Sequence, residues 1–244
     1  MLQLAKIALA PLLLWQGLQV RRKALRLPEA AGPRSGSAGV GELRLRLLIL
    51  GDSSGAGVGA PSQEEALAGR LSEALAQRLQ GRVQWQLIAR TGHTTADALA
   101  EFRSAELAAA DVLVTALGVN DVVSQVSPRR WVRLLQEVHE LAVQRAGVRY
   151  SLHSAVPPMH AFPLLPQPLR WLLGAHALRM NHMLARSLAG QAQRGLQALP
   201  AHLHGGAAAD LMAPDGFHPG PAGYQIWADA LAERLVHQIT LSSR

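Results

Sequence analysis

Residues of the kind that carry out nucleophilic catalysis occur at two distant places in the sequence. Ser53 follows the apolar run Leu43–Leu50 and begins a glycine-rich stretch that ends near Ala60. Far downstream, Asp215 and His218 lie three residues apart, just before the last apolar segment. At this spacing a carboxylate can orient an imidazole from the same short turn, while the second ring nitrogen faces a serine. One interpretation is therefore a serine nucleophile with a histidine base.

The glycine-rich stretch has two other interpretations. Gly55, Gly57 and Gly59 form G-x-G-x-G, but a dinucleotide-binding loop needs G-x-G-x-x-G and a P-loop needs a lysine. Residues Gly51–Gly55 also satisfy G-x-S-x-G, the nucleophile elbow of α/β-hydrolases. That serine follows several strands and an oxyanion loop, whereas Ser53 follows the first strand-like run and the comparable string His204–Gly206 lies downstream. Nucleotide binding and the nucleophile elbow therefore both fit less well than a third interpretation, the nucleophile loop of another kind of hydrolase. In that interpretation the glycines give slack, that is, conformational freedom, around an exposed serine.

Strand-like and helix-like segments alternate along the chain and would position these residues. We expect strands at Leu43–Leu50, Val83–Ile88, Asp111–Gly118 and Val148–Ser154. Helical periodicity predicts helices over Leu67–Leu79, Thr95–Leu107, from Pro128, near Pro168–Gln193 and around Trp227–Leu235. This order predicts an α/β fold, a flavodoxin-like three-layer α/β/α sandwich with a central parallel sheet.

Ligand chemistry in such sheets gathers on loops at the carboxyl ends of the strands. Four polar or glycine-rich stretches occupy that position or could reach it: Gly51–Ala60, Arg90–Thr95, Gly118–Asp121 and Asp215–His218. We therefore expect them to form one site.

Four short blocks in these loops resemble those of the SGNH, or GDSL-like, serine hydrolase family. Gly51–Ser53 matches the first block, although Ser54 stands where leucine is usual. Gly92 matches the glycine of the second block, Gly118–Asp121 matches G-x-N-D, and Asp215–His218 matches D-x-x-H. Each string is weak alone, but the four occur in order and each lies at an expected strand end or before a helix.

The resemblance implies a role for each matching residue. Ser53 would be the nucleophile, His218 the general base and then acid, and Asp215 its orienter. The N–H groups of Ser53 and Gly92 and the side-chain amide of Asn120 would form the oxyanion hole. Glycine suits the second position because a side chain could obstruct the substrate's approach to the backbone, and asparagine donates without adding a charge. No cofactor is implied.

Composition divides the chain into three parts. Residues 1–27 are apolar and then basic, residues 28–41 have the composition of a linker, and residues 42–244 would be the hydrolase domain. The first part is too interrupted by polar residues and proline to be a clean bilayer span, and no small-x-small cleavage site follows it.

Apolar side chains of the first part share one side of a helix, as in helices that lie in a membrane interface. These residues are Leu4, Ile7, Leu14, Trp15 and Leu18. The alternative is an extra helix packed on the domain. If the helix is an anchor, the cations at Arg21–Lys23 favour the cytoplasmic side for the rest of the chain.

The apolar stretch Val156–Gly174 follows the fourth expected strand. Met159, Phe162 and Leu165 are predicted to line an acyl pocket or to touch a lipid surface. The alternative is an ordinary segment that covers the domain.

Composition argues against several other classes of function. The net charge is +7, but the arginines are dispersed and no basic run alternates with aromatic residues, which argues against nucleic acid. The chain has no cysteine, so thiol nucleophiles and cysteine metal sites are excluded. His202, His204 and Asp210 resemble a metal set only in part, and a solvated loop is favoured.

These observations predict a membrane-associated serine esterase that cleaves lysophospholipids, other acyl esters or thioesters. Two alternatives stay open: a carbohydrate O-deacetylase of the same family, and a catalytically silent relative that binds lipid or glycan.

Overall fold

A six-stranded sheet forms the centre of the computed structural model, which describes residues 8–162, 164–200 and 210–242. The strand order is β1-β3-β2-β4-β5-β6, and neighbouring strands are parallel except for β1 and β3. The strands are β1 (Ser35–Ala38), β2 (Leu43–Gly51), β3 (Arg82–Ala89), β4 (Val112–Ala116), β5 (Tyr150–Ser154) and β6 (Arg194–Gln197).

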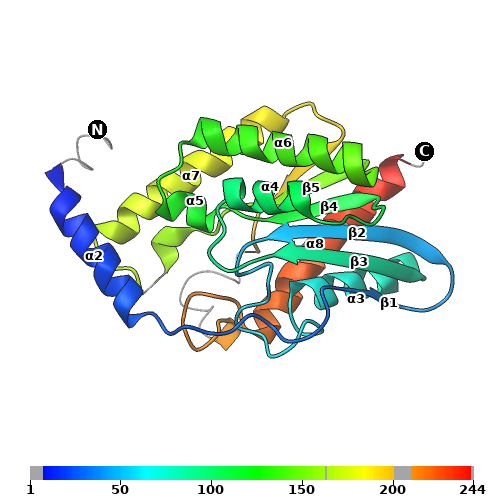
Figure 1. Cartoon of the computed structure of the whole chain (residues 1–244), viewed down its shortest axis with the longest axis horizontal. Coiled ribbons are helices and arrows are strands. Elements are labelled where there is room, and N and C mark those ends of the chain that lie inside the picture. Colours follow the sequence, from blue (N-terminus) through cyan, green and yellow to red (C-terminus); the bar gives the residue numbers. More distant parts are fainter. Residues whose placement is uncertain (1–7, 163, 201–209, 243–244) are drawn as a thin grey trace.

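Helices cover both faces of this sheet (Figure 1). On one face, Leu47 and Ile49 of β2 join a hydrophobic cluster with α3 (Leu67–Leu79) and α8 (Pro221–Ser242). On the other face, Leu48 and Leu50 join a cluster with α4 (Thr95–Ser104) and α6 (Pro128–Ala146). Alternate residues of β2 are thus buried on opposite faces, which explains its continuous apolar run. The predicted α/β/α sandwich is confirmed.

The remaining helices flank this core. They are α2 (Ala10–Lys23), the short α5 (Val119–Val123), the 3₁₀ turn η1 (Met159–Ala161) and α7 (Leu169–Leu188). Local signals set the helix ends: Thr94 and Asp97 form a capping box on α4, and Ser127 caps α6 just before Pro128.

The segment 28–41 differs from the predicted linker because it contains β1, which pairs antiparallel with the edge of β3. A Cβ on Gly36 would lie 3.0 Å from the Trp85 ring, closer than ordinary van der Waals contact, so glycine lets this strand pass close to the ring. The strand has no apolar alternation because most of it is exposed. Periodicity therefore gave no signal for it, nor for the four-residue β6.

Helix α2 packs against the hydrophobic cluster that includes α7 through Leu13 and Val20, and it also buries one polar side chain there. The amide of Gln16 donates to the carbonyl of Gln167 at 2.7 Å, and its oxygen accepts from the N–H of Leu169 at 3.1 Å. Leu14 and Trp15 on the same helix are 70% and 57% exposed. Leu4 and Ile7 lie outside the described residues. Within the part of the chain that is described, no helix is long and apolar enough to cross a membrane.

Candidate active site

Ser53, His218 and Asp215 form a continuous chain of hydrogen bonds at the carboxyl end of β2. The Nε2 atom of His218 lies 2.8 Å from Ser53 Oγ. Its Nδ1 atom lies 2.6 Å from Asp215 Oδ2. The structure thus brings together three residues that are as much as 165 positions apart in the sequence. With Nδ1 protonated toward the carboxylate, Nε2 is free to accept the serine proton.

The turn Asp215–His218 holds its own carboxylate in place. Asp215 Oδ1 accepts the backbone N–H groups of Phe217 at 2.9 Å and of His218 at 3.0 Å. Burial alone would raise the pKa of Asp215, but the hydrogen bonds from the His218 side chain and from these N–H groups lower it overall. Asp215 is therefore ionised at neutral pH, as an orienter of imidazole requires.

The glycine-rich loop after Ser53 packs tightly against this turn, and this corrects the expectation that its glycines give slack. Gly59 has a φ of +99°, and a Cβ on it would lie 2.4 Å from the carbonyl oxygen of Pro219. The neighbouring Val58 carbonyl accepts the hydroxyl of Tyr224 at 2.7 Å. Glycine at position 59 therefore serves the close approach of the serine loop to the histidine turn.

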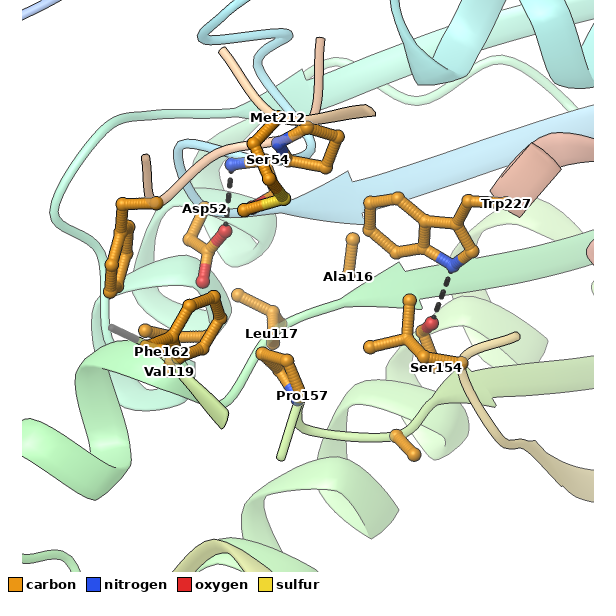
Figure 2. A pocket seen from close by; sticks show the side chains of 14 residues that line it. Asp52, Ser54, Ala116, Leu117, Val119, Ser154, Pro157, Phe162, Met212 and Trp227 are labelled. Atoms are coloured by element: carbon orange, nitrogen blue, oxygen red, sulfur yellow. Dashed lines mark hydrogen bonds between the residues drawn. The ribbon is translucent and has the colours of Figure 1, made fainter. Parts of the chain in front are cut away.

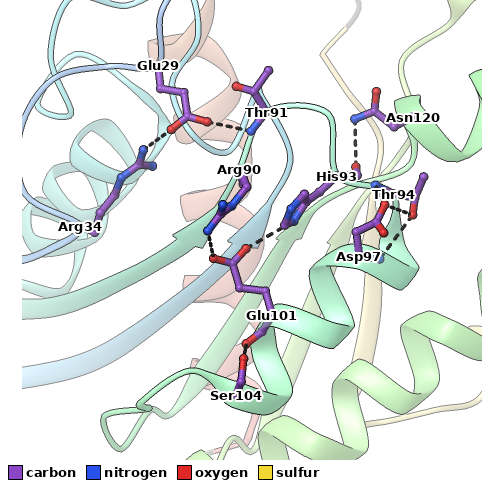
Figure 3. Close-up of polar contacts among 10 residues, drawn as sticks. All are labelled: Glu29, Arg34, Arg90, Thr91, His93, Thr94, Asp97, Glu101, Ser104 and Asn120. Atoms are coloured by element: carbon purple, nitrogen blue, oxygen red, sulfur yellow. Dashed lines mark hydrogen bonds and ion pairs between the residues drawn. The ribbon is translucent and has the colours of Figure 1, made fainter.

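Three predicted oxyanion donors come from two neighbouring loops and from the short helix α5, which carries Asn120. Among the described residues, no acceptor is found for the N–H of Ser53 or of Gly92. One hydrogen of the Asn120 amide goes to the His93 carbonyl at 2.9 Å, which leaves the second available (Figure 3). Gly92 has a φ of +86°, and a Cβ there would meet nothing within 4 Å. The backbone conformation, rather than crowding by the protein, thus requires glycine at this position.

An apolar cavity of about 60 Å³ lies beside the hydrogen-bonded triad. Figure 2 shows the side chains that line it. Its walls include the chain neighbours of both Ser53 and His218. They also include the ends of β4 and β5, and Trp227 of α8, whose indole N–H donates to Ser154 Oγ at 2.9 Å. The lining residues are Asp52, Ser54, Ala116, Leu117, Val119, Ser154, Ala155, Pro157, Phe162, Leu199, Met212, Phe217, Pro219 and Trp227.

Only one of the three residues predicted to bind the acyl group lines this cavity. Phe162 does, and its ring stacks on Phe217 with centroids 5.0 Å apart. Met159 and Leu165 instead lie buried in the hydrophobic cluster formed with α6 and α7. Sequence reasoning missed Phe217 and Trp227. The position of Phe217 within the D-x-x-H block was the available signal for the first.

Two buried aspartates flank the site and accept hydrogen bonds from neighbouring loops and helix starts. Asp52 Oδ1 accepts the N–H of Ser54 at 3.0 Å, and Asp121 Oδ2 accepts the N–H and hydroxyl of Thr95 at 2.9 and 2.8 Å. Burial raises the pKa of Asp52 to about 7, despite the Ser54 hydrogen bond and the nearby His218. Burial likewise raises the pKa of Asp121.

His93 lies beside the predicted oxyanion loop and is only partly exposed. Its Nδ1 lies 3.4 Å from a carboxylate oxygen of Glu101, without the alignment of a hydrogen bond (Figure 3). The predicted loop histidines His202 and His204 lie outside the described residues. Within the described ranges, no group of three residues is arranged to hold a metal ion.

The sequence pattern of the GDSL-like lipase/acylhydrolase family matches residues 49–226, a span that contains all four blocks. The chain belongs to this family. Membership supports an ester hydrolase, in agreement with the resemblance that the blocks indicated. Among curated proteins, no relative matches the sequence.

Solved structures share the fold of this GDSL-like chain at low sequence identity. A member of the lipolytic protein G-D-S-L family from Veillonella parvula is 14% identical, with a TM-score of 0.58 over 80% of this chain and 99% of that one. A psychrotrophic esterase from Pseudoalteromonas sp. is 18% identical, with a TM-score of 0.60 over 81% and 100%. A carbohydrate acetylesterase from Sinorhizobium meliloti is 18% identical, with a TM-score of 0.56 over 80% and 99%.

Proposed function

We propose that this member of the GDSL-like family is a serine esterase that hydrolyses acyl esters through an acyl-Ser53 intermediate. The observation that carries the proposal is the unbroken chain from Asp215 through His218 to Ser53, at 2.6 and 2.8 Å. A serine hydroxyl is a weak nucleophile until a base removes its proton, and His218 Nε2 lies at hydrogen-bond distance to do so.

The proposed reaction has two halves. Ser53 Oγ attacks the ester carbonyl while its proton passes to His218 Nε2. The tetrahedral intermediate collapses, the ester C–O bond breaks, and His218 protonates the leaving alcohol. Water then attacks the acyl-enzyme with His218 again as base, and the acid leaves as Ser53 recovers its proton. Asp215 holds the ring and stabilises its cationic form throughout.

The negative oxygen of each intermediate would be stabilised by the N–H groups of Ser53 and Gly92 and by the Asn120 amide. Their available hydrogens support this role, because donors already committed to the protein could not bind the oxyanion. No acceptor among the described residues takes either N–H, and Asn120 keeps one amide hydrogen.

The apolar cavity beside Ser53 supports the proposal that the acyl group of the substrate binds there. The cavity is small, at about 60 Å³, which favours a short acyl chain. The same observation supports carbohydrate O-deacetylation as a second candidate, because acetyl is the smallest such acyl group. Long-chain lysophospholipids and thioesters are the further substrates to compare.

Fluorophosphonate labelling tests the nucleophile. We expect the wild-type chain to label covalently and Ser53→Ala to lose labelling and hydrolysis. Ser124→Ala, which changes an exposed serine outside the cavity, should keep both. A wild-type chain that binds esters or glycans but does not label would instead indicate a silent relative.

A panel of substrates tests the acyl group. Acetyl, butyryl, octanoyl and palmitoyl esters of one alcohol would be compared with acetylated sugars, lysophospholipids and acyl thioesters. We expect kcat/KM to be highest for acetyl or butyryl esters. A preference for palmitoyl esters or lysophospholipids would contradict the cavity argument while leaving the nucleophile unaffected.

The exposed face of α2 supports association with a membrane surface. Leu14, Trp15 and Leu18 are each more than half exposed, and the exposed cations Arg22 and Lys23 follow. The carboxyl ends of the strands point toward the side of the molecule where α2 lies (Figure 1). A membrane bound to this helix would therefore lie on the side of the site.

Sedimentation with vesicles tests this surface. We expect the full chain to bind vesicles of phosphatidylglycerol and phosphatidylcholine more than phosphatidylcholine alone. Replacing Leu14, Trp15 and Leu18 by serine should abolish binding without loss of hydrolysis of a soluble ester. Unchanged binding of this variant would contradict the proposal.

A further inference from the structure

Glu29 lies beside the loop that carries Gly92, although it belongs to the segment before the first block of the family. Its Oε1 accepts the N–H of Thr91 at 2.7 Å, across 62 positions in the sequence. Its second carboxylate oxygen pairs with Arg34 (Figure 3). The bound N–H therefore belongs to the residue immediately before Gly92.

The Gly92 loop has little core packing to hold it. Thr91 and Gly92 are both exposed. Polar contacts from outside the loop fix its position instead. Asn120 donates to the His93 carbonyl at 2.9 Å, and Glu101 of α4 pairs with Arg90 at 3.0 Å. Glu29 supplies the contact to the peptide that precedes Gly92, which none of these other groups makes.

The backbone beside Glu29 is attached to the loop that follows Ser53. The N–H of Ala30 donates to the Ala56 carbonyl at 3.2 Å. The buried side-chain amide of Gln63 donates to two carbonyls in the same place, that of Ala30 at 3.2 Å and that of Ala56 at 3.0 Å. Glu29 thus bridges the two loops that carry the Ser53 and Gly92 N–H groups.

The Glu29 side chain is suited to a fixed contact. It is 30% exposed. Partial burial would raise its pKa, but the Thr91 hydrogen bonds and the Arg34 charge outweigh burial and lower the pKa below its ordinary value. The side chain is therefore a carboxylate at neutral pH, and carboxylates are strong acceptors of backbone N–H groups.

We propose that Glu29 is a positioning residue for ester hydrolysis, which fixes the Gly92 N–H relative to that of Ser53. This inference rests on the proposed function. Oxyanion donors act only when they are held at the position where charge develops, so a loop freed from Glu29 would lower kcat more than it raises KM.

Four variants of the full chain test the contact. Glu29→Ala should lower kcat for a short-chain ester by about ten- to a hundredfold, less than the loss expected for removing an oxyanion donor outright, with KM little changed. Glu29→Gln keeps an acceptor for Thr91 and should keep most of kcat. Glu29→Asp keeps the charge but is too short, and should behave like Glu29→Ala. Arg34→Ala should have a small effect.

The order of these variants separates positioning from other roles. If the Arg34 ion pair mattered, Arg34→Ala and Glu29→Gln would be the damaged variants, and the proposal would fail. It would also fail if Glu29→Ala kept kcat, or if kcat fell only in proportion to folded protein measured by thermal unfolding. Glu42→Ala is the matched control, because Glu42 is an exposed glutamate paired with Arg44.

The proposed function fails in a different way. If wild-type protein neither hydrolyses esters nor reacts with fluorophosphonate, both proposals are overturned. If wild type is active, Ser53→Ala is inactive and Glu29→Ala retains kcat, only the role of Glu29 is overturned.

Discussion

His218 and Asp215 reach Ser53 from a single four-residue turn, whereas the loop that carries Gly92 is held by side chains of three other segments, two of them distant in the sequence. On the first side, Asp215 accepts hydrogen bonds from two backbone N–H groups of its own turn and from the Nδ1–H of His218. On the second side, Glu29, Glu101 and Asn120 each contact a different residue around Gly92 (Figure 3).

The two halves of the candidate site are therefore held in different ways: the histidine turn by hydrogen bonds within itself, and the Gly92 loop by side chains of other segments. The hydrolytic half comprises Ser53, His218 and Asp215. It depends on hydrogen bonds within the Asp215–His218 turn and on Gly59, which lets the serine loop approach that turn. The oxyanion half comprises the exposed Gly92 loop and Asn120. It depends on polar contacts between that loop and side chains of other segments. Substitutions in the first half should affect chemistry abruptly, whereas substitutions around the second should give graded losses.

The larger of the expected losses is that of Asp215→Asn in the hydrolytic half. The amide would retain the shape of the turn but could not stabilise the imidazolium or favour the required tautomer, so kcat should fall by about 10⁴-fold. Steady-state kinetics on a short-chain ester would measure the change. Asp210→Asn, an exposed aspartate nearby, is the control. Retention of more than a tenth of kcat would show that His218 does not depend on Asp215.

A smaller loss is expected from Asn120→Ala in the oxyanion half. This variant removes one proposed donor and the hydrogen bond to His93, so kcat should fall by about 10²–10³-fold. The comparison variant is Ser124→Ala, which changes an exposed side chain just after α5. A loss equal to that of Asp215→Asn would contradict the distinction between the halves, as would no loss at all.

The same contrast explains what could be predicted from the sequence. The D-x-x-H turn, the Gly51–Ser53 block and the apolar strands carry their signal within a few residues, and the structure places them as expected. Glu29 carries no such signal, because its partner Thr91 is 62 positions away and the segment around it has no periodicity. A short polar strand such as β1 has no local sequence signal either.

The lining of the apolar cavity was predicted only in part, for a related reason. Met159, Phe162 and Leu165 are all apolar, and in an irregular segment no period decides which side chain faces a cavity. The structure directs Phe162 toward Phe217, and buries Met159 and Leu165 against α7. Composition could identify an apolar segment after β5 but not its inward and outward faces.

The smallest effect on catalysis is expected from Asp52→Asn, which tests the buried carboxyl beneath the hydrolytic half. Burial raises the pKa of Asp52 from 3.8 to about 7. Between these values the folded protein keeps a proton that the unfolded chain loses, so this group makes stability fall as pH rises from about 4 to 7. The full effect is on the order of a few kcal/mol.

Asparagine keeps an acceptor for the Ser54 N–H and has no charge to bury. The free energy of unfolding of Asp52→Asn, relative to wild type, should therefore increase from pH 4 to pH 8, with only a modest change in kcat. Urea unfolding at several pH values would measure this trend, with Asp210→Asn as the exposed control. A constant difference between variant and wild type across this range would show that Asp52 is ionised in the folded protein. The Asp52 carboxylate would then be a buried negative charge beside His218. The hydrolytic half and the Gly92 loop would in that case differ in their hydrogen bonds but not in whether they tolerate a charge.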